Sequence, residues 1–223
     1  MIDKQSLAAI IDYSLLKMIS REKFVKGCKE AALYKFASVT VNPANVQEAV
    51  KLLEGSGVPV GTVAGFPLGA TITEAKIVEA QKALEYGAVY VDMVLNIYAL
   101  KAGDFDLVYH DICGVKNVVR DKGLTRVILE NCYLTDNEKI LACELCIKAG
   151  ADFVKTSTGY GPSGASVDDV RLMVKTAKGR IKVKAAGGIY TLKDALAMIN
   201  AGADRLASSK SLDIMAELDT MNG

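Results

Sequence analysis

The stretch KAGADFVK, residues 148–155, ends a helical pattern at a glycine and continues into a short apolar strand. The same order recurs in EYGAVYVD, residues 85–92, and in NAGADRLA, residues 200–207. Glycine is typical of the position just after a helix, where the backbone turns left-handed. The three stretches therefore indicate one β-α unit that is used repeatedly with the same helix-to-strand joint.

Short apolar runs alternate with longer amphipathic stretches along the whole chain. The expected strands are Ile10–Tyr13, Phe36–Val41, Val58–Ala64, Val89–Val94, Arg126–Asn131, Phe153–Thr156, Ile181–Ala185 and Ala203–Ala207. Several are almost continuously hydrophobic, as parallel strands covered on both faces are. Eight strands alternating with helices predict an α/β fold, a (β/α)8 TIM barrel that forms a single domain over residues 1–223 with a short N-terminal helix. A doubly wound open sheet is the alternative.

Composition and charge exclude several classes of partner. The chain has 27 Lys and Arg against 26 Asp and Glu, a net charge of +1, so we expect no nucleic acid and no anionic membrane as partner. No apolar run approaches the length of a membrane span, and the N-terminus lacks the pattern of a signal peptide. We expect a cytoplasmic protein.

The cysteine pattern gives no sign of a metal site. Of the five cysteines (Cys28, Cys113, Cys132, Cys143 and Cys146), the last two form a C-x-x-C inside a helical pattern. That pattern begins with a capping box, Thr135 and Glu138, and ends at Gly150. A redox motif would lie at a helix start, so we expect buried, reduced thiols, with redox chemistry as the less favoured alternative. His110 is the only histidine, which argues against zinc.

Polar residues gather where the apolar runs end, at the face where barrel enzymes carry their active sites. These residues are Asp12, Asn42, Asp92, Asn96, Glu130, Asn131, Lys155, Lys184, Ser208 and Ser209. The segments ADFVKTSTG and RIKVKAAGG have the same form, an apolar strand followed by a lysine, and Lys155 and Lys184 lie 29 residues apart. This is about one β-α-β unit, so we expect the two lysines at one level of neighbouring strands.

The pairing of lysines predicts a nucleophile. A second ammonium nearby and partial burial both favour the uncharged amine, which can attack a carbonyl and form a Schiff base. Lys182 shares the face of Lys184 but lies one layer lower, and we expect it not to act. Asp92 supplies a carboxylate that can hold the two ammoniums and move protons. A purely structural ion network explains the same residues equally well.

Two loops, one of them with a glycine pair, predict an anion subsite. Gly187 and Gly188 precede one helix, and Ser208, Ser209 and Lys210 precede the last one. In barrels, the loops after the seventh and eighth strands often hold a phosphate through backbone N–H groups. The alternative is that the glycines only form turns and that Lys210 is solvated. The loop GFPLGAT, residues 65–71, carries two apolar side chains, Phe66 and Leu68. They either shield the site from water or only pack against the rest of the protein.

Five motifs together resemble the deoxyribose-phosphate aldolase family. They are FVKTSTGYG, VKAAGGI, VDMVLNIYALKAGD, GFPLGA and VILENCYLT, and the resemblance extends from about Ile11 to Ile214. It implies a class I aldolase without metal or cofactor. Such an enzyme reversibly cleaves 2-deoxy-D-ribose 5-phosphate to acetaldehyde and D-glyceraldehyde 3-phosphate, so its partners are a phosphorylated sugar and aldehydes. A homodimer is implied by the family alone.

The resemblance also implies roles for individual residues. Lys155 is the Schiff-base lysine, Lys184 perturbs it, Asp92 is the acid/base partner, and Asp12 hydrogen-bonds the lysine network. The resemblance assigns the Gly187–Gly188 loop and the serines near Ser208 to a phosphate subsite. The full set of expected phosphate or substrate contacts is Thr156, Gly159, Gly187, Gly188, Ser208, Ser209 and Lys210. Either Ser208 or Ser209 fits as the main phosphate ligand.

The chain departs from the family pattern at several positions. Tyr13 stands for a histidine, Thr40 for a cysteine, Tyr98 for a glycine, Asn131 for a threonine and Tyr190 for an arginine, and the segment Ala207–Ser211 is altered. We expect these changes to cluster around the substrate pocket and the phosphate loop. They leave two other functions open: the same imine chemistry on an altered or non-phosphorylated substrate, and a non-catalytic barrel that binds a phosphorylated metabolite.

Overall fold

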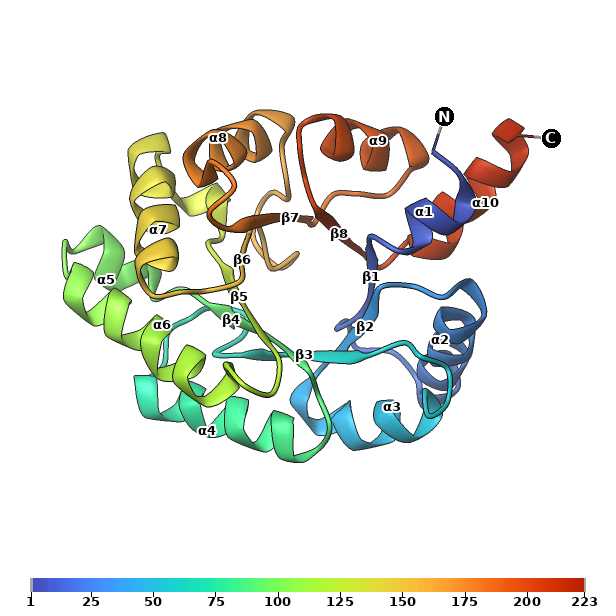
Figure 1. Cartoon of the computed structure of the whole chain (residues 1–223), viewed down its shortest axis with the longest axis horizontal. Helices are drawn as coiled ribbons and strands as arrows, with labels where there is room; N and C mark the ends of the chain where they lie inside the picture. The colour runs from blue at the N-terminus through green and yellow to red at the C-terminus, as the bar shows by residue number, and fades with distance from the viewer. Residues whose placement is uncertain (1, 223) are drawn as a thin grey trace.

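The computed structural model describes residues 2–222 and shows a closed barrel of parallel strands surrounded by helices (Figure 1). Each strand pairs with its neighbour in the sequence, and β1 also pairs with β8, with Ile11 opposite Leu206. This closure confirms the predicted (β/α)8 barrel and excludes the open sheet.

The elements alternate as the sequence predicts. The strands are β1 (Ile11–Leu15), β2 (Ser38–Val41), β3 (Val60–Ala64), β4 (Tyr90–Val94), β5 (Leu124–Ile128), β6 (Phe153–Lys155), β7 (Lys182–Ala186) and β8 (Arg205–Ser208). The helices are α1 (Lys4–Ala8), α2 (Arg21–Tyr34), α3 (Val46–Leu52), α4 (Thr73–Glu85), α5 (Ile97–Lys101), α6 (Phe105–Val119), α7 (Asp136–Lys148), α8 (Val167–Ala177), α9 (Leu192–Asn200) and α10 (Ser211–Asn222). Short 3₁₀ helices, η1 (Pro43–Asn45) and η2 (Asn131–Tyr133), follow β2 and β5.

The repeated helix-to-strand joint has one backbone geometry. Gly87, Gly150 and Gly202 have φ angles of 96°, 73° and 101°, which L side chains rarely adopt. After each glycine, the N–H of the next alanine donates to a carbonyl in the last helical turn, over 2.9, 3.0 and 3.1 Å. This is the Schellman arrangement, and it explains why glycine and then alanine recur in the sequence.

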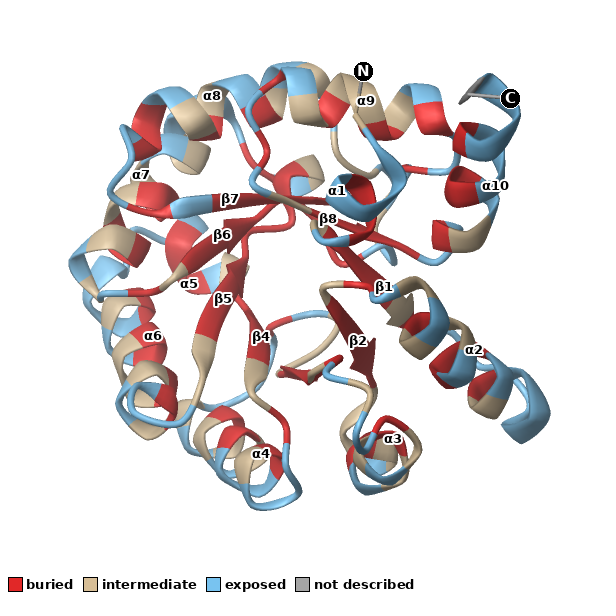
Figure 2. Cartoon of the chain, turned by 45° about the vertical axis from the view of Figure 1, so that its right-hand side comes forward, coloured by how far each residue is buried: buried red, intermediate tan, exposed pale blue. Residues whose placement is uncertain are grey.

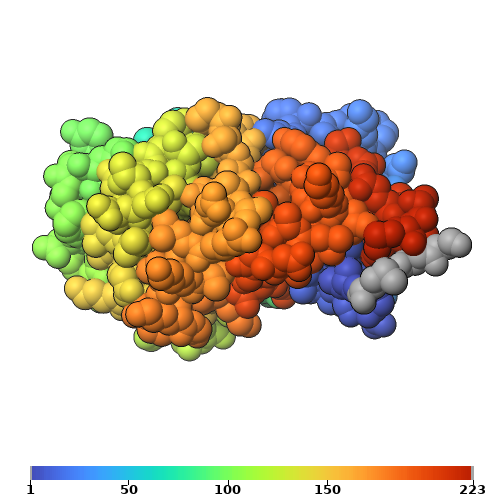
Figure 3. Space-filling model, turned by 90° about the horizontal axis from the view of Figure 1, so that it is seen from above, coloured from blue at the N-terminus to red at the C-terminus, as the bar shows by residue number. Residues whose placement is uncertain are grey.

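The core lies between the barrel and the inner faces of the helices. The strands are almost entirely buried, whereas the helices alternate buried and exposed residues (Figure 2). The two ends of the chain pack side by side, as the blue and red surfaces of Figure 3 show, and Lys4 reaches Asp219 over 2.6 Å. Among residues 2–222, no helix has both the length and the apolar character of a membrane span.

The bounds of every strand differ by one to three residues from the expected ones, and two of these differences move predicted site residues. Strand β1 continues to Leu15, so Asp12 lies within the strand and not at its end. Strand β5 ends at Ile128 because Glu130 adopts a left-handed conformation, with a φ of 54°, which breaks the extended backbone. Glu130 and Asn131 therefore belong to the loop after β5.

The C-x-x-C lies within α7, whose predicted capping box of Thr135 and Glu138 is present. Burial raises the pKa of Cys143 to about 12 and that of Cys146 well above its usual value, so both thiolates are disfavoured. Cys28, Cys143 and Cys146 are buried as expected, but Cys113 and Cys132 are partly exposed. All five thiols are unpaired in the structure.

A buried ion pair ties the outer helices to the barrel. The Lys76 ammonium of α4 lies 2.5 Å from the Asp111 carboxylate of α6, and both side chains are buried. The same ammonium donates to the carbonyl of Val94, the last residue of β4, over 2.9 Å. The pair therefore fixes the carboxyl end of the strand that carries Asp92.

We predict that Asp111→Ala destabilises the protein by about 3–5 kcal/mol, because it leaves a buried ammonium without its counter-ion. Glu85→Ala is the control, since its pair with Lys82 lies on the surface, where solvent screens an ion pair and leaves it little effect on stability. Urea unfolding followed by circular dichroism measures both. Equal losses in the two variants would contradict the role of the buried pair.

Candidate functional site

Lys155 and Lys184 lie at the same level of the barrel. They are direct partners in the β6–β7 ladder, and both are buried, with 2% and 0% of their surface exposed. The predicted neighbourhood of the two lysines is therefore present. Lys182 begins β7 and is exposed, with its ammonium 5.7 Å from the centre of the Phe153 ring.

Asp92 joins the two lysines from the other side of the barrel. Its Oδ2 atom lies 2.8 Å from the Nζ atom of Lys155 and 3.2 Å from that of Lys184. One carboxylate oxygen thus contacts both amines. The arrangement gives a continuous path for a proton between Lys155 and Lys184 through Asp92.

Asp12 completes the network from β1. Its carboxylate lies 2.8 Å from the Lys184 ammonium and accepts a hydrogen bond from the Ser38 hydroxyl over 2.6 Å. The guanidinium groups of Arg126 and Arg205 contact the same carboxylate over 2.8 and 3.2 Å. Four cations and two carboxylates therefore meet inside the barrel, which leaves an excess of positive charge.

The excess charge determines the protonation states. Burial alone would raise the pKa of Asp12, but the charges of Arg126, Lys184 and Arg205 outweigh it and lower the pKa to about 2. Burial opposes ionisation of Asp92 too, yet the neighbouring cations, Lys155 first, hold its pKa below the usual range. Burial and then the Arg126 charge lower the pKa of Lys184 to about 8. Near neutral pH both carboxylates are ionised, and Lys184 lies close to its titration point.

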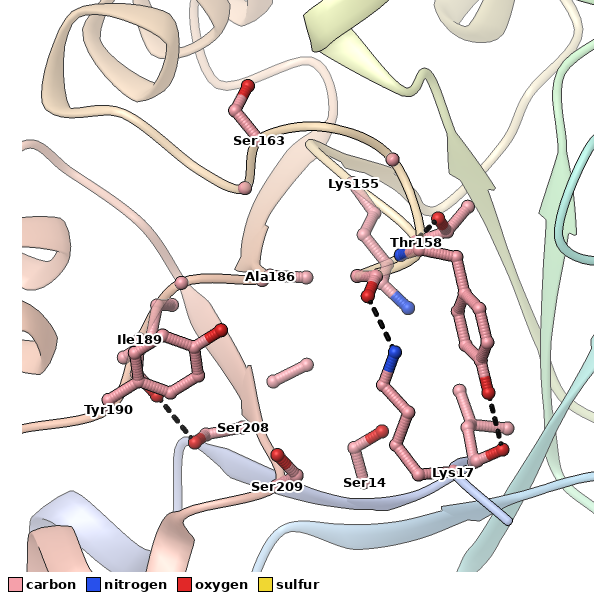
Figure 4. A pocket seen from close by; sticks show the side chains of 18 of the residues that line it. Ser14, Lys17, Lys155, Thr158, Ser163, Ala186, Ile189, Tyr190, Ser208 and Ser209 are labelled. Atoms are coloured by element: carbon pink, nitrogen blue, oxygen red, sulfur yellow. Dashed lines mark hydrogen bonds between the residues drawn. The ribbon is translucent and has the colours of Figure 1, made fainter.

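Lys155 connects this network to a pocket at the carboxyl ends of the strands. The pocket has a volume of about 180 Å³, and the Lys155 side chain points into it (Figure 4). Asp12, Asp92 and Lys184 are not among the residues that line the pocket. The network therefore lies behind Lys155, which presents its amine to any molecule in the pocket.

The pocket wall is built from loops that approach each other closely. The predicted residues Gly159, Gly187 and Gly188 line it. A Cβ atom on Gly164 would lie 2.3 Å from the Gly187 carbonyl, so only glycine allows this approach. The N–H of Ala165 also donates to the Gly187 carbonyl over 3.0 Å. The loops after β6 and β7 are thus held against each other.

The two serines after β8 differ in how their hydroxyl groups are used. Both line the pocket, but the Ser208 hydroxyl donates to the Ile189 carbonyl over 2.7 Å and accepts from the Lys210 N–H over 2.8 Å. Ser209 is exposed, and no side-chain hydrogen bond engages its hydroxyl among the described residues. Ser209 is therefore the serine with a hydroxyl available to a ligand.

Two other predicted contacts lie outside the pocket lining. The Lys210 ammonium pairs with Asp213 over 3.0 Å, and both side chains are more than half exposed. The Thr156 hydroxyl donates to the Ala186 carbonyl over 3.1 Å and accepts from its N–H over 3.0 Å. Thr156 thus joins β6 to β7 in the present structure.

Most of the unusual residues lie away from the pocket, which corrects the expectation that they cluster around it. Tyr13 packs edge-on against Phe36, and Asn131 donates to the Met173 sulfur. Thr40 is buried, and Tyr98 is 84% exposed. Among the departures, Tyr190 and the residues Ala207–Ser209 line the pocket.

Sequence reasoning missed several residues of the site. Arg126 was included only as the start of an expected strand, although an arginine inside an apolar run is a signal for a buried ion pair. Lys17 and Tyr160 also line the pocket, from the loops after β1 and β6. Neither stands at a strand end, so no pattern in the sequence distinguishes them from solvated loop residues.

We predict that Asp12→Asn lowers the free energy of unfolding at neutral pH and that this difference from wild type shrinks in acid. The pKa of Asp12 falls from 3.8 in the unfolded chain to about 2 in the folded protein. Ionisation of Asp12 therefore adds about 2 kcal/mol to the free energy of unfolding above pH 4. This contribution is lost as the pH falls from 4 to 2. Urea unfolding of wild type and variant at pH 7, 4 and 3 measures the difference. The matched control is Asp168→Asn, since the Asp168 side chain is 96% exposed. A difference between wild type and Asp12→Asn that stays constant down to pH 3 would disprove the coupling.

Known proteins resemble this chain over almost its full length. Residues 6–211 match the family described as DeoC/LacD family aldolase. The deoxyribose-phosphate aldolase of Clostridium kluyveri is 51% identical over 96% of this chain and 98% of its own, and that of Carboxydothermus hydrogenoformans is 51% identical over 98% and 97%. The structure of deoxyribose phosphate aldolase from Aeropyrum pernix has a TM-score of 0.91 at 32% identity and covers 98% of this chain and 93% of that one. The chain therefore belongs to the DeoC/LacD aldolase family.

Proposed function

We propose that this protein is a deoxyribose-phosphate aldolase, a lyase that reversibly cleaves 2-deoxy-D-ribose 5-phosphate to acetaldehyde and D-glyceraldehyde 3-phosphate. The observation that carries the proposal is the position of Lys155, whose side chain lines the pocket while its amine contacts Asp92 in the buried network. The curated relatives with this activity support the substrate.

Lys155 forms the covalent intermediate in this proposal. Its uncharged amine attacks the C1 aldehyde of the open-chain sugar, and loss of water together with uptake of one proton from the Asp92–Lys184 relay gives a protonated imine. The imine withdraws electrons, so the C2–C3 bond breaks when the C3 hydroxyl gives up its proton. The three-carbon aldehyde phosphate leaves, and the enamine that remains takes a proton at C2. Water then hydrolyses the imine, which releases acetaldehyde and restores the amine.

The proton transfers require groups matched to neutral pH. Lys184, with its pKa lowered to about 8, exchanges a proton readily in this range. Asp92 stays ionised, and its Oδ2 atom contacts both amines, so it links Lys155 to Lys184 along the path of the proton. We infer that Asp92 and Lys184 act as one relay behind the nucleophile, and that Asp12 holds Lys184 in place.

The phosphate lies, in this proposal, against the loops after β7 and β8. Gly187 and Gly188 have φ angles of 79° and 73°, and this glycine pair allows the backbone to approach an anion closely. Ser209 offers an unengaged hydroxyl at the same wall. Thr156 and Ser208 support the loops from behind, and Gly159 closes the opposite side.

The same imine chemistry on a non-phosphorylated substrate is the second candidate. The observation that favours it is Tyr190, an uncharged residue that lines the pocket and is 59% exposed. The third candidate is a non-catalytic barrel that binds a phosphorylated metabolite through the same glycine loops. It requires no chemistry at Lys155.

The organisation of the protein extends the proposal. We propose a single catalytic domain over residues 1–223, a cytoplasmic location and a homodimer. The solved Aeropyrum pernix relative is described as a tetramer, so light scattering coupled to gel filtration distinguishes the two assemblies.

We predict that borohydride reduction in the presence of acetaldehyde adds a two-carbon group to Lys155. The adduct forms because the reductant traps the imine, and peptide mass spectrometry locates it. Lys155→Leu removes both the adduct and retro-aldol turnover. Wild-type protein without an adduct on Lys155 would eliminate the aldolase proposal in both of its forms.

We also predict a preference for the phosphorylated sugar. The kcat/KM for 2-deoxyribose 5-phosphate exceeds that for 2-deoxyribose at least 100-fold, because the phosphate supplies binding energy away from the reacting bond. A coupled assay of aldehyde release measures both substrates. Equal values would favour the non-phosphorylated substrate, and turnover of either one excludes the non-catalytic barrel.

A further inference from the structure

Lys17 brings a second cation into the pocket from outside the buried network. It follows β1 by two residues, and its side chain extends from the loop after β1 toward the middle of the pocket (Figure 4). Lys155 and Lys17 are the two charged side chains among the described residues that line this pocket. Since Lys155 has the covalent role, Lys17 is the charge available for recognition.

The Lys17 ammonium is held in place by the loop after β6. It donates to the Gly159 carbonyl over 2.8 Å and lies 3.5 Å from the centre of the Tyr160 ring. The ring is itself fixed, because the Tyr160 hydroxyl donates to the Leu16 carbonyl over 2.9 Å and Phe66 packs edge-on against the ring. A lysine ammonium has three N–H donors, so donors remain for a ligand in the pocket.

No carboxylate among residues 2–222 lies within 4.0 Å of the Lys17 ammonium. The other cation expected to bind phosphate, Lys210, is neutralised by an ion pair. Lys210 pairs with Asp213 and does not line the pocket. Residue 190, at the rim, is an uncharged tyrosine. An anion that enters the pocket therefore meets Lys17 as its unneutralised cation.

Positive charge continues outward from Lys17. Ser14, Lys17 and Ser209 also line a neighbouring hollow of about 330 Å³, whose wall carries Lys23 and Lys26 of α2. One acidic residue, Glu30, lines the same hollow and lies 3.6 Å from Lys26. The hollow thus attracts anions to the side of the pocket where Lys17 and the Ser209 hydroxyl lie.

We propose that Lys17 is the specificity-determining cation that recognises the phosphate monoester of the substrate, in concert with Ser209 and the Gly187–Gly188 backbone. The Gly159 carbonyl and the Tyr160 ring hold its ammonium ready for the anion, so the charge-assisted contact needs little reordering of the side chain. The inference rests on the proposed function. It places the phosphate-binding positive charge on Lys17, in the loop after β1, because Tyr190 is uncharged and Lys210 is paired with Asp213.

Lys17→Met tests the proposal, because methionine keeps an unbranched chain and removes the charge. We expect it to lower kcat/KM for 2-deoxyribose 5-phosphate at least tenfold, mainly through KM, and to change kcat/KM for 2-deoxyribose less than twofold. Lys17→Arg keeps the charge and retains the phosphate preference within threefold. Lys29→Met is the matched control, since it removes an exposed charge from α2 that lines neither hollow.

Binding of glycerol 3-phosphate, measured by calorimetry, separates this inference from the proposed function because it needs no turnover. We expect the affinity to fall at least tenfold in Lys17→Met and less than twofold in Lys29→Met. Equal loss of kcat/KM on both sugars would overturn the inference and make Lys17 a loop-positioning residue. A larger loss of phosphate affinity in Lys210→Met than in Lys17→Met would overturn it as well. Failure of borohydride trapping on Lys155 would instead contradict the aldolase proposal. The role of Lys17 would then be tested by the affinity for glycerol 3-phosphate alone.

Discussion

The contact of one Asp92 oxygen with two lysine amines is the constraint on which the site depends. Charges buried in a protein are costly unless they are paired, and here two carboxylates serve four cations. Burial, and after it the remaining positive charge, lowers the pKa of Lys184 to about 8, which brings a proton-transfer group into the neutral range. The same charges keep Asp12 and Asp92 ionised. A single electrostatic arrangement therefore stabilises the interior and prepares the nucleophile.

The network is shared among strands that are distant in sequence. Asp12 comes from β1, Asp92 from β4 and Lys184 from β7, so these groups can meet only when the sheet closes on itself. The outer layer supports the same geometry, because Lys76 binds both Asp111 and the end of β4. Closure of the barrel and the helix ion pair thus both bear on β4, the strand that carries Asp92.

Chemistry and recognition occupy different layers of the barrel mouth. The ionic network lies behind Lys155, whereas the pocket in front of it is lined by loops after β1, β6, β7 and β8. Tyr190 and Ser209 belong to the outer layer, because they line the pocket and make no contact with the ionic network. The departures at Thr40 and Asn131 lie outside both the network contacts and the pocket lining, whereas Tyr13 lines the neighbouring hollow that carries Lys23 and Lys26.

The sequence by itself determined the alternation of strands and helices, the glycine joints and the alignment of Lys155 with Lys184, because each follows from local periodicity and from ladder pairing of neighbouring strands. It did not determine where β5 ends, since the left-handed Glu130 is held by contacts with Thr158 in the next loop. Nor did it reveal that Arg126 and Arg205 share Asp12, or that Lys17 lies over Tyr160. Those contacts join residues more than 100 positions apart, and only the closed barrel brings them within the few ångströms at which charges and hydrogen bonds act.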